Sequence, residues 1–249
     1  MRKKKILMML ALLLMTAVGA RAQATYTVTV KDGTEDAANW SATPNPAREG
    51  QGVTIKYNGK KKVKRVTAVM AALRPLAEVT PADQGKIAGA DGIIYGTKAA
   101  AEAAGTQAVA MIAYVGSETD NAAYKHGLAI ALSDEGKMNW STAKSTCEGK
   151  TPTISGAAWM LPSQNQWKTM FKANGGNDAS HTGLNAALAT AGGSKLLEII
   201  GGYWSSSEVD GDKAKDVSLQ FNDYLDDYIA VWYPDKKDGA YRVRACLVF

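Results

Sequence analysis

The C-terminal run from Gly202 to Phe249 constrains the fold of this chain more than any other stretch. It opens with an aromatic and hydroxyl block, Tyr203 to Glu208, and closes with a segment that alternates between apolar and polar side chains, Tyr241 to Phe249. Alternation with a period of two predicts a strand at the end of the run. Between the two ends the chain is rich in Asp, Asn, Tyr and Trp, the residue types of contact surfaces. The run therefore predicts a recognition surface on a scaffold.

The first 22 residues have the pattern of a secretory signal peptide. Basic residues at positions 2 to 5 precede an apolar run from Ile6 to Ala20, and Ala20-Arg21-Ala22 forms a small-residue cleavage site. The apolar run is shorter than the roughly 20 continuous residues of a membrane span. We therefore predict an exported chain, secreted, periplasmic or at the cell surface, with no membrane span after signal removal.

The net positive charge of the chain lies in this leader. The chain has 29 basic and 24 acidic residues, a formal net charge of +5, and the leader holds five of the basic ones. Without the leader the balance is zero, so the charge gives no reason to expect nucleic acid as a partner. Outside the leader, basic and acidic side chains lie in different parts of the chain. Residues 23–75 hold nine basic and four acidic side chains, whereas residues 208–238 hold four basic and nine acidic ones. This segregation predicts two modules with different roles.

Residues 23–70 are predicted to form a small antiparallel β module. Alternating residues at 25–30 and 52–57 are typical of strands, and a third strand is expected within 60–69. The lysines of that third segment are of the kind that protects a sheet edge from aggregation.

A larger domain is predicted over residues 84–249, after a linker at 71–83 that contains two prolines. Apolar side chains at three- and four-residue spacing predict amphipathic helices at 139–147 and 164–173, the second capped by Ser163. Further elements are predicted as a short helix at 98–104 and strands at 108–115, 126–132, 215–222, 229–233 and 241–249.

Several separated motifs occur in an order that resembles the C-type-lectin-like fold. They are HGLAIAL from His126, NWSTAKSTC from Asn139, WMLPSQNQW from Trp159, GYWSSSE from Gly202 and YRVRACLVF from Tyr241. In particular they resemble the Fibrobacter major paralogous domain and the variable proteins of diversity-generating retroelements, with relatives of the formylglycine-generating enzyme more distant. The resemblance implies the α+β class, with a C-type-lectin-like domain preceded by the small β module.

In the retroelement-diversified proteins, side chains vary between the serine-rich strand and the final strand while the scaffold stays fixed. The resemblance implies such a surface here at residues 209–233, with Ala214, Val217 and Leu219 as supporting framework. Strand periodicity places Val217, Leu219 and Phe221 on one face. The side chains left free to face solvent or ligand are Lys215, Ser218, Gln220 and Asn222. The implied ligand-binding residues are Asp210, Asp212, Lys213, Lys215, Asp216, Ser218, Gln220, Asn222, Asp223, Tyr224, Asp226, Asp227, Tyr228, Trp232 and Tyr233.

A calcium site is an alternative interpretation of Asp223, Asp226 and Asp227, because carboxylate oxygens are ligands that calcium prefers. The chain has neither EF-hand spacing nor the sugar-binding triplets of calcium-dependent lectins, so we predict no metal and no other cofactor. Catalysis is not predicted either, since the two histidines are far apart and Ser205 to Ser207 lack the elbow of a serine nucleophile.

The chain has two cysteines, Cys147 and Cys246. In an exported protein a small even number of cysteines favours one disulfide. We expect a structural disulfide that links the helix at 139–147 to the last strand, and two buried thiols that never meet are the alternative.

These patterns predict an exported, non-catalytic protein that binds a protein or glycan ligand on a cell or phage surface through residues 209–233. The acidic side chains there favour a basic or hydroxyl-rich partner. A structural or adhesive surface component, such as a fimbrial one, is the alternative, and an enzyme related to formylglycine-generating proteins is a second alternative. The sequence leaves the oligomeric state open.

Overall fold

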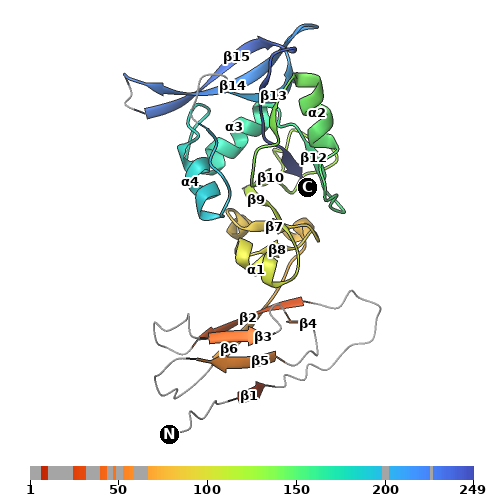
Figure 1. Ribbon diagram of the computed structural model, residues 1–249, viewed down its shortest axis with the longest axis vertical. Coiled ribbons are helices and arrows are strands. Elements are labelled where there is room, and N and C mark those ends of the chain that lie inside the picture. The colour runs from red at the N-terminus through yellow and green to blue at the C-terminus, as the bar shows by residue number, and fades with distance from the viewer. Residues whose placement is uncertain are drawn as a thin grey trace. The chain divides into compact units, whose positions relative to one another are not determined.

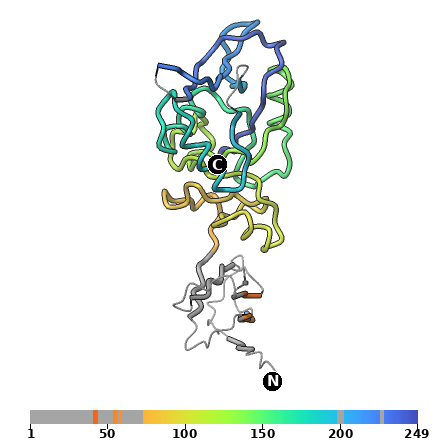
Figure 2. The backbone as a smooth tube through the Cα atoms, turned by 60° about the vertical axis from the view of Figure 1, so that its left-hand side comes forward, coloured from red at the N-terminus to blue at the C-terminus, as the bar shows by residue number. Residues whose placement is uncertain are grey.

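The computed structural model describes residues 7–10, 25–31, 40–43, 47–48, 53–58, 67–197, 202–224 and 227–249. Figure 1 and Figure 2 show the chain from two sides. The chain divides into two compact units. The first comprises Met1–Leu73 with Ala103–Gly105, and the second comprises Arg74–Glu102 with Thr106–Phe249.

The first unit contains two antiparallel sheets. Its strands are β1 (Leu7–Leu10), β2 (Thr25–Lys31), β3 (Trp40–Thr43), β4 (Ala47–Arg48), β5 (Val53–Tyr57) and β6 (Thr67–Ala72). One sheet has the order β1-β5-β3 and the other β4-β2-β6. Threonine and valine alternate along β2, and β-branched side chains favour the extended backbone. The strands predicted at 25–30 and 52–57 are confirmed as β2 and β5.

Two predictions for this unit fall largely outside the described residues. Of the predicted signal peptide, residues 1–22, the structure describes β1, which pairs with β5. The signal peptide therefore stays a prediction. The strand expected within 60–69 begins at Thr67 as β6, and residues 59–66 lie outside the described ranges.

The second unit is built on two further sheets. The elements after β6 are η2 (Leu76–Glu78), η3 (Pro81–Asp83), β7 (Ile87–Gly89), β8 (Ile94–Tyr95), α1 (Lys98–Ala103), β9 (Ala108–Val115), β10 (Gly127–Ala131), β11 (Gly136–Met138), α2 (Trp140–Glu148), β12 (Ala158–Met160), α3 (Gln164–Ala173), α4 (Thr182–Thr190), β13 (Tyr203–Glu208), β14 (Lys213–Asn222), β15 (Asp227–Lys236), β16 (Tyr241–Val243) and β17 (Cys246–Val248). The sheet orders are β12-β17-β10-β9-β7-β8 and β11-β16-β13-β14-β15. The segment predicted as one last strand therefore serves both sheets, since β16 lies in one and β17 in the other.

The range 71–83, expected to be a linker, is shared between the two units. Its first residues end β6, and η2 and η3 belong to the second unit. Asp83 is fully buried, with carboxylate oxygens 2.5 Å from the Arg74 guanidinium and 2.9 Å from the Lys86 ammonium. Ion pairs thus hold the chain in place from Arg74 onward.

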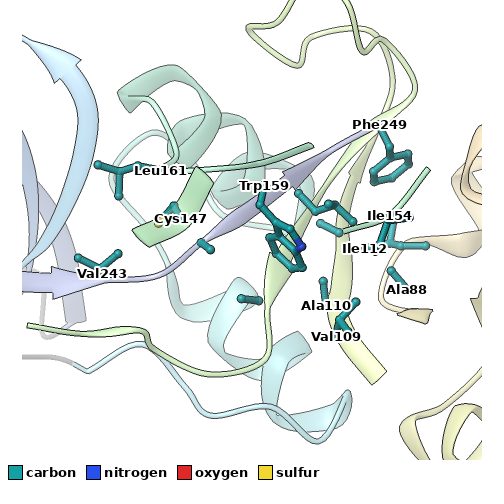
Figure 3. Packing of buried hydrophobic residues seen from close by; sticks show 14 of the residues in the cluster. Ala88, Val109, Ala110, Ile112, Cys147, Ile154, Trp159, Leu161, Val243 and Phe249 are labelled. Atoms are coloured by element: carbon teal, nitrogen blue, oxygen red, sulfur yellow. The ribbon is translucent and has the colours of Figure 1, made fainter. Parts of the chain in front are cut away.

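One hydrophobic cluster joins α2 to strands of both sheets of the second unit (Figure 3). Four tryptophans serve packing, since Trp140, Trp159, Trp167 and Trp204 are at most 8% exposed. Their indole N–H groups also fix β13, because Trp140 donates to the Ser205 carbonyl at 2.8 Å and Trp204 donates to a carbonyl before α2.

The two amphipathic helices are confirmed with their caps. The Asn139 side chain accepts a hydrogen bond from the Thr142 amide at the start of α2. Ser163 and Gln166 form a reciprocal capping box at the start of α3. Within the described ranges, none of the helices has the length and apolar character needed to cross a membrane.

The predicted α+β class is wrong. In the described part of the chain seventeen strands form four sheets, whereas the longest α-helix, α3, has ten residues. The protein is mostly β, and the C-type-lectin-like domain implied by the resemblance is not confirmed. The sequence patterns missed β7 and β11, because strands of three residues are too short to show alternation.

The predicted disulfide is not formed, since Cys147 and Cys246 are both free and buried. Cys147 on α2 packs in the same cluster as Leu247 of β17. Successive side chains of a strand point to opposite faces, so Cys246 points away from that cluster. Burial raises the pKa of the Cys147 thiol to about 12, which keeps it protonated and unreactive at neutral pH.

A buried arginine fixes the strand next to β14. Arg244 is fully buried, and its Nε donates to Asp134 Oδ1 at 2.6 Å while Nη1 donates to the Ala131 carbonyl at 2.9 Å. The Tyr203 hydroxyl of β13 donates to Asp134 Oδ2 at 3.0 Å. This network ties β13 to the connection after β10 and gives β14 a fixed neighbour.

Candidate binding surface on the β14–β15 hairpin

Strands β14 and β15 form a hairpin of two ten-residue strands at the edge of the five-stranded sheet (Figure 1). The register is unbroken, from Lys213 opposite Lys236 to Asn222 opposite Asp227. At the far end the Asn222 side chain accepts a hydrogen bond from the Tyr224 amide at 3.0 Å, a local turn that favours reversal of the chain.

The hairpin has a base, residues 214–219 of β14, that is buried on both faces. On one face Val217 and Leu219 are 1% and 0% exposed, and on the other Asp216 and Ser218 are 0% and 3% exposed. Strand β13 borders the base, with Trp204 opposite Asp216. The predicted framework residues therefore lie in the part of the hairpin that belongs to the core.

The hairpin also has a tip, residues 220–224 and 227–229, where aromatic side chains reach solvent. Phe221 is 49% exposed and Tyr224 is 95% exposed. The rings of Phe221 and Tyr228, opposite each other in the register, meet edge to face with centroids 5.2 Å apart. Exposed large aromatic side chains gathered in this way are typical of a contact surface.

One face of the hairpin carries most of these aromatic side chains. Phe221, Tyr228 and Trp232 share a face, because Tyr228 is opposite Phe221 and Trp232 lies four residues farther along β15. We call these three residues, together with Tyr224 at the turn, the aromatic stripe. Tyr233 is 40% exposed but lies on the opposite face.

The inner part of the aromatic stripe is held by α3 and the loop before α4. The Lys168 ammonium lies 5.7 Å from the centroid of the Trp232 ring. Buried His181 meets Tyr228 edge to face at 6.4 Å. The Ala230 amide between them donates to the Ala179 carbonyl at 2.7 Å. Tyr228 and Trp232 are therefore pre-positioned, whereas Tyr224 extends freely.

The predicted ligand-binding residues divide by exposure. Exposed are Asp210, Asp212, Lys213, Asp223, Tyr224 and Tyr233; partly buried are Lys215, Gln220, Asn222, Tyr228 and Trp232; buried are Asp216 and Ser218. Asp226 and the side chain of Asp227 lie outside the described residues.

Three residues correct the predictions for β14. Asp216 was implied to bind ligand and Ser218 was expected to face solvent or ligand, and both are buried because the base is covered on both faces. Phe221 was expected to share the inward face with Val217 and Leu219, and it is exposed because the strand runs beyond the core. The signal available in the sequence was Asn222, a turn-forming residue directly after Phe221.

The turn between β13 and β14 is held by hydrogen bonds and an ion pair within the protein. Asp210 Oδ1 accepts from the amides of Asp212 and Lys213 at 2.9 and 2.8 Å. The Lys237 ammonium donates to the Asp210 carbonyl at 2.7 Å and pairs with the Glu208 carboxylate. These contacts give Asp210 a role in fixing the turn.

Asp216 of the base is fully buried and acts together with the partly buried Asp235 of β15. Burial, followed by a hydrogen bond and the charge of Asp235, raises the pKa of Asp216 to about 7. Burial and the same Asp235 also raise the pKa of Tyr241, on β16, to about 12.

No group of three or more His, Cys, Asp or Glu side chains within the described ranges could hold a metal ion. Of the three acids in the calcium interpretation, Asp223 is exposed and Asp226 lies outside those ranges.

No family model matches the chain, and no curated protein matches it. Among solved structures the chain is similar to a fimbrial protein from Bacteroides ovatus ATCC 8483, with 14% sequence identity and a TM-score of 0.45. The likeness covers 91% of this chain and 64% of the length of that chain. A likeness at this level carries no conclusion about fold or role.

Proposed function

We propose that this chain is an exported, non-catalytic adhesive component of a cell surface that contacts its partner through the β14–β15 hairpin. The observation that carries the proposal is the aromatic stripe, whose outer members Phe221 and Tyr224 are 49% and 95% exposed. Leaving large apolar rings in water is unfavourable, and covering them on contact is the corresponding gain.

The stripe combines fixed and free contact groups. Tyr228 and Trp232 are packed on their inner sides against His181 and Lys168 and lose little freedom when a partner binds. Tyr and Trp are also the residue types most often found at the energetic centre of protein interfaces. Pre-positioned rings beside a freely exposed Tyr224 suit an open contact surface rather than an enclosed binding pocket.

The chemistry of the tip favours a partner with basic or hydroxyl groups. Asp223 is exposed beside Tyr224, and carboxylates of the same segment follow at 226 and 227. Flat aromatic faces suit apolar side chains and sugar rings equally, whereas the acids accept hydrogen bonds from ammonium, guanidinium or hydroxyl groups. A protein or glycan on a cell or phage surface fits both requirements.

A narrower proposal is that residues 209–233 form a diversified surface, as the resemblance to retroelement variable proteins implies. Asp216 and Ser218 are buried and are therefore excluded from the proposed surface, whereas the exposed Phe221 is added to it. Sequencing the same locus in closely related genomes tests this proposal. It requires substitutions concentrated at the exposed positions, with Tyr203 to Glu208 unchanged.

The adhesive role is tested by probing an array of glycans and surface proteins with the wild-type chain and with a Phe221→Ala/Tyr224→Ala variant. We expect the wild type to bind a subset of spots and the variant to lose at least about tenfold in affinity for them, equivalent to about 1.4 kcal/mol.

Tyr233→Ala is the matched control, because Tyr233 is an exposed aromatic residue on the opposite face of the same hairpin. It should keep the binding pattern of the wild type. Equal affinity of the wild type and the double variant for every bound spot would contradict the proposal.

A further inference from the structure

Two carboxyl groups lie side by side in the base of the hairpin. The register places Asp216 opposite Tyr233 and Ala214 opposite Asp235. Asp216 and Asp235 are therefore diagonal neighbours on one face of adjacent strands, within reach of each other. Besides burial, Asp235 acts on the Asp216 carboxyl group and raises its pKa.

A hydrogen bond between two carboxyl groups requires a proton on one of them, since an ionised carboxylate only accepts. Asp216 Oδ2 already accepts from the Ser218 hydroxyl at 3.1 Å. Asp216 Oδ1 is buried and, with both acids ionised, has no donor among the described residues. A proton held between the two acids supplies the missing donor. Without it, the buried negative charge of Asp216 would lie beside the negative charge of Asp235.

The Lys237 ammonium, two residues beyond Asp235 in the chain, is engaged with the Glu208 carboxylate. The groups that act on Asp216 are Asp235 of β15, Ser218 of its own strand and its own backbone N–H. On β16, the neutral Tyr241 side chain has its pKa raised by burial and by Asp235. On β13, the residue opposite is the uncharged Trp204. Each strand packed around the pair thus contributes either an acid or a neutral group.

We propose that a proton shared by Asp216 and Asp235 stabilises the base of the β14–β15 hairpin, and that loss of this proton weakens the attachment of the hairpin to β13 and β16. We call this shared proton the latch. The latch is independent of what the hairpin binds. It makes the stability of the hairpin depend on pH.

The pH window follows from the direction of the pKa shift. The folded-state pKa of Asp216 is raised to about 7, whereas a carboxyl group of an unfolded chain has a pKa of about 3.9. Between these values the folded state keeps a proton that the unfolded state has released, so stability falls as the pH rises. The loss is complete above the folded pKa, where both states are ionised.

The latch is tested by measuring unfolding midpoints in denaturant between pH 4 and pH 8 for the wild type and for Asp216→Asn. The Asn side chain has nearly the same shape and donates a permanent hydrogen bond to Asp235. We expect the unfolding constant of the wild type to rise with pH across this window by up to about tenfold per unit more than that of the variant. Asp235→Asn, which donates from the other side, should flatten the profile in the same way.

Asp238→Asn is the control, because Asp238 is an exposed acid close to the same strand. Its pH profile should match that of the wild type. Identical profiles for the wild type, Asp216→Asn and Asp235→Asn would overturn the latch. If neither Asn variant folds at pH 5, where the proton is in place, the latch is also overturned, because the variants reproduce the protonated pair.

A bound cation is the competing way to bridge two carboxylates. Adding millimolar calcium or magnesium at pH 8 should leave the midpoint of the wild type unchanged. A rise that Asp216→Asn abolishes would assign the pair to a cation and overturn the shared proton.

Discussion

The base and the tip of β14 differ although they belong to one strand. Leu219 and Phe221 point to the same face two residues apart, yet Leu219 is fully buried and Phe221 is 49% exposed. Both residues lie beyond the end of the pairing with β13 at Val217, so the neighbours on β15 differ instead. Leu219 is opposite Ala230, whose amide donates to the Ala179 carbonyl before α4, whereas Phe221 is opposite Tyr228 near the turn. A strand can thus serve the core at one end and present side chains at the other.

The comparison also separates two kinds of polar side chain. At the base Asp216 and Ser218 are buried and hydrogen-bonded to each other. At the tip Asp223 is exposed. Asp is therefore a buried residue of the core at the base and an exposed residue at the tip.

The largest expected effect is that of Leu219→Ala, which removes a fully buried side chain from the base. We expect a loss of about 2 to 5 kcal/mol in the free energy of unfolding, from lost burial and the cavity left behind. Denaturant titration measures it. A loss below about 0.5 kcal/mol would mean that the base is not part of the core.

Ser218→Ala should have a smaller effect, about 1 kcal/mol, because it removes one buried hydrogen bond. The Ser218 hydroxyl donates to Asp216 and favours its charged form, so the variant should also shift the titration of the pair to higher pH. The pH dependence of the unfolding midpoint reports this shift. A shift to lower pH would contradict the assigned hydrogen bond.

Phe221→Ala, the counterpart of Leu219→Ala at the tip, should cost about 0.5 to 1.5 kcal/mol. That range corresponds to the loss of one aromatic pair with Tyr228. The same titration tests it. A cost equal to that of Leu219→Ala would remove the distinction between base and tip.

Tyr224→Ala should change the free energy of unfolding by less than about 0.5 kcal/mol, because the side chain is 95% exposed. Its effect should appear in binding to array spots instead. A destabilised variant would show that Tyr224 packs on the protein and is not held out for a partner.

The sequence predicted the elements whose signals are local. Ser163 with Gln166 fixes the start of α3, and apolar spacing along Trp167, Met170 and Phe171 fixes its buried face. The strands β2, β5, β9 and β10 were likewise readable from their own residues.

The sequence could not predict burial that depends on distant segments. Asp216 is buried beside Trp204 of β13, and Leu219 is buried where Phe221, two residues farther along the same face, is exposed. The residues of β14 itself do not carry these differences. Two cysteines suggested a disulfide, but alternation along β17 puts Cys246 on the face away from Cys147. The sequence did not predict the mostly β character for the same reason. Short strands such as β7 and β11 are defined by hydrogen bonds to distant strands and have no recognisable pattern of their own.

Amide hydrogen exchange along β14 and β15 at pH 6 tests the division of the hairpin most directly. The account predicts that amides of residues 214–219 exchange only through global unfolding, whereas those of 220–222 and 227–229 exchange through local opening of the two-stranded tip. Uniform protection from Lys213 to Asn222 would contradict it, because the tip would then be as firmly held as the base.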